Sequence, residues 1–359
     1  MKDDNMKILH ILNYVGRGGS ESYIKNLAVS NNSTHELIYN VDGGGVGDFE
    51  ALGVKCTQCD IRSPLDFRAA KFLKRYVIEN EIDLVHTHFM RENGVAFLAK
   101  LIGMRVPVIN TRHMLSHINV VQKLLNRIFF TKNKYVFAVS SRVRTNLLSE
   151  GVRDSKIITL PPPLPIVVAN KNPKPDGERW IVSVGRLSPE KGPLFFVDAI
   201  NELFKSDDAK NYKALIIGYG ELEAEVRDKI AAYNLDDRVI MLGYQKPYDY
   251  LAAADIFVNH SKEEAFGLSI VEAASLGAAL LIEENAGATD YFNEENSSAL
   301  TFKFGDTNEF NTKMKMLMKD DAYRKKIAEN AKNIATSALD QKKIIEIIEK
   351  IYEGAIYGK

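Results

Sequence analysis

The sequence predicts an α/β protein of two domains, each built on a parallel sheet with helices wound over both faces. Short runs rich in β-branched residues alternate with helical stretches throughout, which is the pattern of parallel α/β domains. The chain has 359 residues, more than one hydrophobic core usually serves. The alternation stops at Pro161-Pro162-Pro163-Leu164-Pro165, which cannot lie inside a helix or central strand, and then starts again. We therefore expect domains at 1–164 and 165–340.

The elements of the first domain follow from short apolar runs and from helical spacing. Its clearest expected strands are Lys7–Asn13, Glu36–Asn40, Leu84–His86, Val106–Asn110 and Val136–Val139. Its clearest expected helices are Glu21–Ser30, Phe67–Glu79 and Arg142–Glu150.

The second domain repeats this alternation. Its expected strands are Trp180–Val184, Ala214–Ile217, Val239–Leu242, Ile256–Asn259 and Ala279–Ile282. Its expected helices are Leu194–Phe204, Glu223–Tyr233 and Leu268–Leu276. From Thr307 the chain is mostly helical, and 341–359 is expected to be a helix that packs back on the first domain. Its apolar face is expected to comprise Ile344, Ile347, Ile348 and Ile351.

Composition indicates an ordinary globular protein. Hydrophobic residues make up 45% and charged residues 26% of the chain. No apolar run reaches the 18 or so residues of a transmembrane helix. Cys56 and Cys59 are too few for a disulfide scaffold, so we expect free thiols in a cytoplasmic protein.

The two halves of the sequence differ in charge. Residues 1–164 hold 22 Lys and Arg against 15 Asp and Glu, whereas the whole chain holds 47 of each. A positive first half suggests a contact with something anionic, such as a membrane surface or a phosphorylated acceptor. The alternative is solvated surface charge without a partner.

A glycine-rich loop, Gly16-Arg17-Gly18-Gly19-Ser20-Glu21, joins the first strand to the first helix. Glycine lets backbone N–H groups approach an anion, and a helix N-terminus adds a favourable dipole. The spacing is not the Gly-x-Gly-x-x-Gly of dinucleotide binding, which counts against a nicotinamide dehydrogenase. An ordinary strand-to-helix turn is the alternative.

A second loop, residues 185–192, directly follows the strand that opens the second domain. Arg186 and Lys191 stand at either end of it. Two cations near a helix start suit a diphosphate, with Arg as a bidentate fork and Lys as a point charge. The alternative is that Lys191 and Glu190 only decorate the start of the helix.

The third loop, residues 264–272, reads Glu-Ala-Phe-Gly-Leu-Ser-Ile-Val-Glu. Gly267 lets the chain bend into a helix whose first amides are free to bind an anion. Glu272 lies among small apolar residues, where a carboxylate needs donors that sugar hydroxyls would supply. The alternative is that Glu264 and Glu272 only form salt bridges, for instance to Lys262.

With these loops in this order, the sequence resembles the retaining glycosyltransferases of the GT-B fold, in particular the family 4-like bacterial enzymes. The resemblance covers most of the chain. The motifs that carry it are Gly18-Gly19-Ser20-Glu21, Gly185-Arg186-Leu187 with Lys191-Gly192, and Glu264-x7-Glu272. It implies two Rossmann-like doubly wound domains that face each other across a cleft, the first on the acceptor side and the second on the donor side.

The resemblance also implies roles for the matching positions. Arg186 and Lys191 would hold the donor diphosphate and offset its charge as it leaves. Glu264 would face the transferred sugar without acting as a covalent nucleophile. His113 would contact the sugar near the reacting carbon, and a capping or surface histidine is the alternative. The donor-binding positions are Gly18, Gly19, Gly218, Tyr244, Phe266, Gly267, Leu268, Ser269 and Glu272.

The implied activity is transfer of a sugar, with retained configuration, from a nucleoside diphosphate sugar. UDP is expected in preference to GDP, and the acceptor is a glycan or lipid-linked hydroxyl in bacterial cell-surface polysaccharide assembly. Because the chain contains no Asp-x-Asp, we expect no metal, and no cofactor besides the nucleotide sugar. The alternative function is a catalytically inactive relative that binds or stabilises another transferase.

Two further features each have two interpretations. His86 and His88, with Cys56 and Cys59 upstream, are zinc-ligand types, but without a second set at zinc-site spacing a packing role is favoured. The segment 117–134 mixes leucine and phenylalanine with lysine and arginine. It is predicted either to lie on an anionic membrane at the inner face of the cell membrane or to be a core-facing helix. No nucleic-acid module is recognisable.

Overall fold

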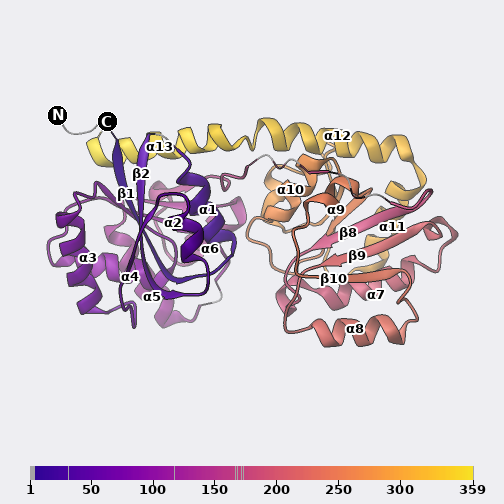
Figure 1. Ribbon diagram of the computed structural model, residues 1–359, viewed down its shortest axis with the longest axis horizontal. Coiled ribbons are helices and arrows are strands. Elements are labelled where there is room, and N and C mark those ends of the chain that lie inside the picture. Colours follow the sequence, from indigo (N-terminus) through magenta and orange to yellow (C-terminus); the bar gives the residue numbers. More distant parts are fainter. Residues whose placement is uncertain are drawn as a thin grey trace. The chain divides into compact units, whose positions relative to one another are not determined.

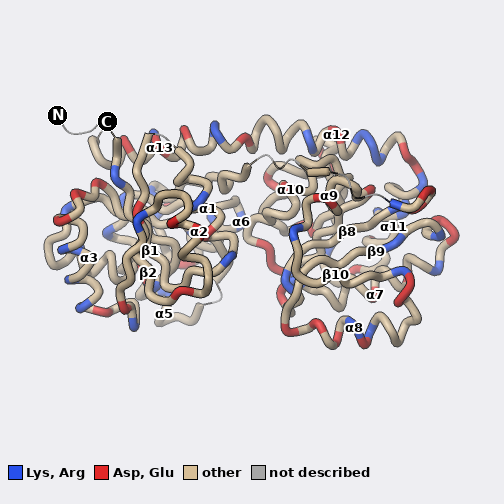
Figure 2. Tube along the Cα trace, in the orientation of Figure 1, with Lys and Arg blue, Asp and Glu red and all other residues tan. Residues whose placement is uncertain are grey.

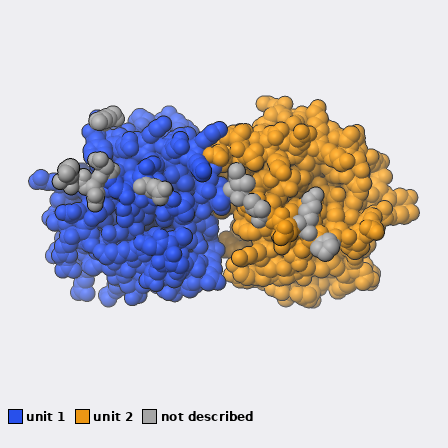
Figure 3. Space-filling model, turned by 45° about the horizontal axis from the view of Figure 1, so that its top comes forward, with its two compact units in different colours: residues 1–165, 341–359 blue, residues 166–340 orange. Residues whose placement is uncertain are grey.

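The structure is a computed structural model that describes residues 5–358 apart from residues 31, 117, 166, 168, 171 and 173. It divides into two compact units (Figure 3). Unit 1 comprises Met1–Pro165 with Gln341–Lys359, and unit 2 comprises Ile166–Asp340. The C-terminal helix thus belongs to the same unit as the N-terminal part of the chain.

Unit 1 contains one parallel sheet surrounded by helices (Figure 1). Its strands within the described residues follow the order β3-β2-β1-β4-β5-β6-β7. The strands are β1 (Met6–Val15), β2 (Ser33–Asp42), β3 (Lys55–Gln58), β4 (Leu84–Thr87), β5 (Val108–Arg112), β6 (Tyr135–Ala138) and β7 (Ile157–Thr159). The strand order reverses between β1 and β4. Such a switch point is where open α/β sheets bind ligands, beyond the carboxyl ends of the strands.

Helices cover both faces of this sheet. They are α1 (Gly19–Leu27), α2 (Val46–Glu50), α3 (Phe67–Glu79), α4 (Met90–Leu101), α5 (Val120–Phe129), α6 (Ser141–Ser149) and α13 (Gln341–Tyr357). Alternate residues of β1 point to opposite faces, as strand geometry requires. Ile8 and Leu12 pack with α1 and α13, whereas Leu9 and Ile11 pack with α3 and α4. Both faces are buried, which explains the nearly unbroken apolar sequence of β1.

The apolar face of α13 differs in part from the expectation. Ile344 and Ile348 are buried, as predicted, but Ile345 is also buried and Ile347 is 45% exposed. Tyr352 is completely buried in the same cluster. The prediction that Ile347 belongs to the apolar face is therefore wrong. The buried stripe runs through Ile344, Ile345, Ile348 and Tyr352, which leaves Ile347 on the exposed side of the helix.

Unit 2 contains a second parallel sheet, with the described strands in the order β10-β9-β8-β11-β12-β13. The strands are β8 (Arg179–Val184), β9 (Tyr212–Ile217), β10 (Val239–Gly243), β11 (Ile256–Asn259), β12 (Ala279–Glu283) and β13 (Leu300–Phe302). The helices are α7 (Pro193–Leu203), α8 (Glu223–Ala232), α9 (Tyr248–Ala253), α10 (Leu268–Leu276), α11 (Thr307–Lys319) and α12 (Asp321–Ser337). Here the order reverses between β8 and β11, so the second switch point lies there. The expected fold class, two parallel α/β units of Rossmann type, is confirmed.

Basic and acidic residues are interspersed along the chain in both units (Figure 2). Among the described helices, none combines the length and the apolar character needed to cross a bilayer.

Candidate active site

A pocket in unit 2 lies at the switch point between β8 and β11. It is lined by residues 183–187, Lys191, Ile216 and residues 258–261. These residues come from the carboxyl ends of the strands and from the loops that follow, where parallel α/β sheets present ligand-binding groups. Both Arg186 and Lys191, predicted from the sequence, belong to its lining.

Lys191, which lines this pocket, pairs with Glu264. The Lys191 Nζ atom lies 2.6 Å from Glu264 Oε2, and the Ser261 hydroxyl donates to the same oxygen at 3.2 Å. The two side chains are only 21% and 14% exposed. Glu264 is therefore paired with Lys191, 73 residues earlier, and not with the neighbouring Lys262 as in the alternative.

Arg186 is held less firmly than Lys191. Its Nη2 atom donates to Glu190 Oε1 at 3.0 Å, and its side chain is 66% exposed. Glu190 also accepts from the Ser188 hydroxyl at 2.7 Å. An exposed guanidinium with one carboxylate partner can turn toward a diphosphate at little cost.

His260 supports the loop that carries both cations. Its Nε2 atom lies 2.7 Å from the Ser183 hydroxyl, and its Nδ1 atom lies 2.8 Å from the Lys191 carbonyl oxygen. The ring stacks on Phe196 at 4.6 Å between centroids, and burial lowers its pKa to about 4. A neutral His260 therefore fixes the Lys191 backbone, a role that the sequence analysis missed. The signal available in the sequence was the position of His260 directly after Asn259, where the expected strand ends.

The N-terminus of α10 completes this group. Gly267 precedes the helix with φ 103°, a left-handed conformation that favours glycine. The carbonyl oxygens of Glu264 and Phe266 accept from Gly287 N and Ala288 N at 3.1 and 2.7 Å, which anchors the loop. Helix starts leave backbone N–H groups without intrahelical acceptors, so the amides of Leu268 and Ser269 are available to an anion.

Glu272 lies within α10, half-buried among small apolar residues. Burial raises the pKa of its carboxyl to about 7, while a hydrogen-bonding interaction with Tyr248 opposes this rise. That sugar hydroxyls supply further donors to this carboxylate stays a prediction.

The loops after β8, β9 and β10 lie side by side. Gly218 N donates to the Gly243 carbonyl oxygen at 2.9 Å, and a Cβ on Gly218 would stand 1.9 Å from the Gly185 carbonyl oxygen. Tyr219 and Tyr244 follow, with their rings edge to face at 5.3 Å and with exposures of 57% and 69%. Two exposed aromatic rings on these loops can contact a planar base.

In unit 1 the glycine loop leads into α1, which begins at Gly19 with Gly18 as its N-cap. The Glu21 carboxylate turns back and accepts from Gly16 N at 2.7 Å. A second pocket lies at the β1/β4 switch point, lined by residues 13–14, 20–21, Phe89 and residues 91–92. The expectation that Gly18 and Gly19 approach a phosphate stays a prediction.

Glu92 is a buried carboxyl in this second pocket that the sequence did not single out. It has no exposed surface, and burial raises its pKa to about 7. Its Oε1 atom accepts from Asn13 N, and its Oε2 atom has no partner within the described residues. A protonated Glu92 would offer a hydrogen-bond donor to a ligand of this pocket.

His113 follows β5 and is half-buried. Its Nε2 atom lies 2.9 Å from His88 Nδ1, and the Tyr23 ring from α1 stands edge-on at 5.0 Å. It is therefore neither a helix cap nor an isolated surface side chain.

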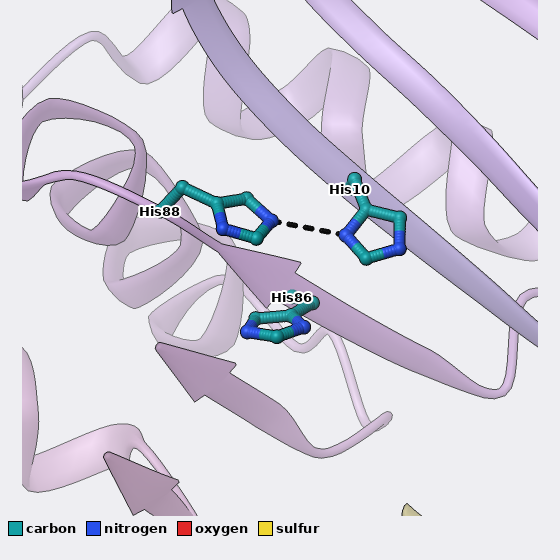
Figure 4. Close-up of side chains that lie close together, drawn as sticks. All are labelled: His10, His86 and His88. Carbon is teal, nitrogen blue, oxygen red and sulfur yellow. Dashed lines mark hydrogen bonds between the residues drawn. The ribbon is translucent and has the colours of Figure 1, made fainter. Parts of the chain in front are cut away.

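Three buried histidines near His113 form a group of metal-ligand type. One ring nitrogen from each of His10, His86 and His88 lies within 4.8 Å of the other two (Figure 4). His10 Nδ1 is hydrogen-bonded to His88 Nε2 at 3.0 Å, and the His86 nitrogens lie 2.6 Å from Tyr352 OH and 2.7 Å from Thr111 Oγ1. A metal would have to displace these bonds, so the geometry favours a hydrogen-bonded cluster. Cys56 and Cys59 do not belong to this metal-capable group.

Comparisons with known proteins agree with this architecture. Residues 17–168 match the model described as Glycosyltransferase Family 4, and residues 168–334 match that described as Glycosyl transferases group 1. A solved structure of Anabaena Alr3699/HepE in complex with UDP has a TM-score of 0.84 at 20% identity, covering 97% of this chain and 100% of that one. This likeness shows the GT-B fold.

Two of the relatives with named activities act on lipid-linked sugars. One is the N-acetylgalactosamine-N,N'-diacetylbacillosaminyl-diphospho-undecaprenol 4-alpha-N-acetylgalactosaminyltransferase of Campylobacter jejuni, 30% identical over 169 residues, or 46% of this chain and 44% of that protein. The other is the UDP-Gal:alpha-D-GlcNAc-diphosphoundecaprenol alpha-1,3-galactosyltransferase of Escherichia coli, 25% identical over 49% of this chain and 46% of that protein. The matches thus span less than half the length of these two relatives. With two adjoining glycosyltransferase models matched from residue 17 to residue 334, the chain belongs to the glycosyltransferase family.

Proposed function

We propose that this protein is a retaining glycosyltransferase that uses a nucleoside diphosphate sugar, UDP-linked in preference to GDP-linked. Its acceptor would be a hydroxyl of a glycan or lipid-linked sugar in bacterial cell-surface polysaccharide assembly. The observation that carries the proposal is the unit 2 pocket, where Arg186 and Lys191 line one switch point and Glu264 pairs with Lys191. The named Campylobacter and Escherichia relatives, which act on undecaprenol-diphosphate-linked sugars, support the acceptor class.

The proposed chemistry is a displacement at the anomeric carbon. The bond from this carbon to the diphosphate oxygen breaks, and its electron pair leaves on that oxygen. Arg186, Lys191 and the first amides of α10 offset the growing negative charge. The acceptor oxygen bonds to the same face of the sugar, and its proton passes to the departing phosphate oxygen.

Glu264 fits an orienting role in this reaction. Its Oε2 atom already accepts from Lys191 and Ser261, which holds the carboxylate in one orientation. A diphosphate would become a second anionic partner of Lys191, leaving Glu264 lone pairs for sugar hydroxyl donors. A carboxylate engaged in this way is a poor covalent nucleophile.

The test is release of nucleoside diphosphate from a panel of nucleotide sugars in the presence of EDTA. We expect slow hydrolysis of one donor, faster turnover with its acceptor, and a loss of ~100-fold in Lys191→Ala and Arg186→Ala. Lys210→Ala is the matched control, because its side chain is 74% exposed and its ion-pair partner among the described residues is Asp207, three residues earlier. Donor binding without turnover would favour the inactive relative, and a loss of turnover with EDTA would overturn metal independence.

A membrane-facing role for α5 belongs to the same proposal. The helix leaves exposed the large apolar side chains Val120, Val121, Leu124 and Ile128. Lys123 and Arg127 are exposed on the same helix. The core-facing alternative does not account for these apolar side chains, of which Val120 is 82% exposed. His117, at the start of the segment, lies outside the described residues. An exposed apolar stripe flanked by cations suits the interface of an anionic bilayer.

Vesicle flotation tests the membrane contact. We expect the protein to float with anionic vesicles, less so at high salt, and to lose binding in Leu124→Ser. Leu101→Ser is the matched control, because Leu101 ends α4 and is 56% exposed. Equal flotation with neutral vesicles would contradict an electrostatic contact.

A further inference from the structure

A continuous chain of hydrogen bonds runs through the core of unit 1 from His113 to the C-terminal helix. His113 Nε2 lies 2.9 Å from His88 Nδ1, and His88 Nε2 lies 3.0 Å from His10 Nδ1 (Figure 4). His10 Nε2 lies 2.8 Å from His35 Nδ1, and His35 Nε2 lies 2.9 Å from the Ser33 hydroxyl. The Ser33 hydroxyl reaches Glu349 Oε1 on α13 at 3.3 Å.

The sheet register explains why these rings meet. His10 lies directly opposite His86 on β4, and Ile8, two residues earlier, lies opposite His35 on β2. The side chains at positions 8, 10 and 12 of β1 share one face, and this face packs against α1 and α13. His88 directly follows β4, and its Nδ1 atom is hydrogen-bonded to His113.

The four histidines of this hydrogen-bonded relay are neutral. Burial lowers the pKa values of His10 and His88 well below the usual range, and those of His35 and His113 to about 4 and about 3. A neutral imidazole has one donor nitrogen and one acceptor nitrogen. Each ring must therefore donate on one side and accept on the other, so the whole chain has a single direction.

Glu349 fixes this direction because a carboxylate only accepts hydrogen bonds. It is 5% exposed and accepts from the hydroxyls of Ser30 and Ser33 and from the Asn32 amide. Once the Ser33 hydroxyl donates to Glu349, its oxygen accepts from His35 Nε2–H, which leaves His35 Nδ1 as an acceptor. The same step repeated at His10 and His88 requires a donor at His113 Nε2. Aligned N–H dipoles that point toward a carboxylate in a buried site also favour this direction.

We propose that Glu349 sets the tautomer of His113 through this relay, placing the proton on Nε2 and a bare lone pair on Nδ1. Among the described residues, none hydrogen-bonds to Nδ1 of His113. This atom is thus a fixed acceptor, suited to a ligand hydroxyl and unsuited to a carbonyl or phosphate oxygen. If the proposed function holds, on which this last step rests, the ligand hydroxyl belongs to the donor sugar. Glu349 is then a positioning residue that never touches substrate.

The test is a long-range ¹H–¹⁵N correlation spectrum of the ring nitrogens in histidine-labelled full-length protein without ligand. The chain has seven histidines, and a His113→Gln variant assigns the His113 signal. In the wild type we expect the proton on His113 Nε2. In Glu349→Gln and in Ser33→Ala the direction is no longer set, so the Nε2–H fraction falls toward about one half.

Two variants on α13 serve as matched controls. Glu346→Gln removes an exposed carboxylate three residues before Glu349, and Tyr352→Phe removes a buried hydroxyl that bonds His86 outside the relay. Both should leave the His113 tautomer unchanged. A His113 protonated on Nδ1 in the wild type, as when Ser33 donates to His35, would overturn the proposal. Unchanged tautomers in both Glu349→Gln and Ser33→Ala would overturn it as well.

A kinetic measurement separates this proposal from the proposed function. Glu349→Gln should lower kcat about two-fold or more with little change in donor KM, because only part of the population presents the acceptor at Nδ1. The expected tautomer shift without sugar transfer from any donor would reject the proposed function and leave the relay standing. Sugar transfer together with an unshifted tautomer would reject the relay and leave the proposed function standing.

Discussion

The pKa of Glu272 gives a direct test of the donor site. Without a ligand, burial raises it from its ordinary value of 4.5 to about 7, so the carboxyl is largely protonated in mildly acidic solution. We expect the ribose hydroxyls of the donor to donate to this group, which favours its ionised form and lowers the pKa again. Binding therefore releases a proton, and donor affinity should rise with pH up to about 7 and then level off.

The size of this effect follows from the two pKa values. If binding returns the pKa from about 7 to 4.5, donor affinity should increase about twenty-fold between pH ~5.5 and pH ~7.5. The assay is calorimetric titration with UDP-glucose. In this ligand both phosphates are esterified, which removes the phosphate-monoester ionisation near pH ~6 that would confuse a titration with UDP.

Substitution identifies the group responsible. Glu272→Gln should bind more weakly at pH ~7.5 and lose the pH dependence, because its amide does not titrate in this range. Glu295→Gln, an exposed carboxylate elsewhere in unit 2, should behave like the wild type. A wild-type affinity that falls with pH, or an equal slope in Glu272→Gln, would refute this reasoning.

Two further predictions concern single residues. Gly218→Ala should lower Tm by several degrees and weaken donor binding, because φ is 143° and the new Cβ would meet the Gly185 carbonyl oxygen at 1.9 Å. Gly177→Ala, with φ 79° and open space, carries only the backbone strain, so an equal drop in Tm would contradict a clash. For Glu92, burial raises the pKa from 4.5 to about 7 in the folded protein. The protonated carboxyl therefore contributes stability that is fully present below pH 4.5, and this contribution is lost as the pH rises through about 7. Glu92→Gln should remove up to about 3 kcal/mol of this pH-dependent loss, measured by denaturant unfolding between pH ~4 and pH ~8; an unchanged pH profile would show that Glu92 does not cause it.

The sequence predicts the sheets well where strands are buried on both faces. The unbroken apolar run in β1 has no other favourable arrangement in a folded protein. The short edge strand β3, Lys-Cys-Thr-Gln, has no such run and was missed. The helix α4 was also missed, because Gly94 lies inside this unbroken helix, where glycine is unfavourable. The reason for Gly94 is a packing contact, since a Cβ there would lie 2.4 Å from the Pro64 carbonyl oxygen.

The candidate site was predictable only where its parts lie close together in the sequence. Glycines and charges in the loops 185–192 and 264–272 indicate an anion site, and both loops do meet in unit 2. The pairing of Glu264 with Lys191 instead of Lys262 depends on how β8 and β11 align. The histidine relay depends on the register across the four strands β2, β1, β4 and β5 and on Glu349, 316 residues from Ser33, so no local pattern contains it.

The position of α13 has a consequence for synthesis of the protein. Ile344, Ile348 and Tyr352 complete a core that otherwise belongs to residues before the proline linker. During translation, unit 2 can finish folding while the apolar face of the first sheet that α13 covers is still partly exposed. The first unit to leave the ribosome is thus the last to close. A premature stop codon or a proteolytic cut that removes α13 would therefore destabilise the N-terminal part of unit 1, exposing a surface on which chaperones and proteases can act.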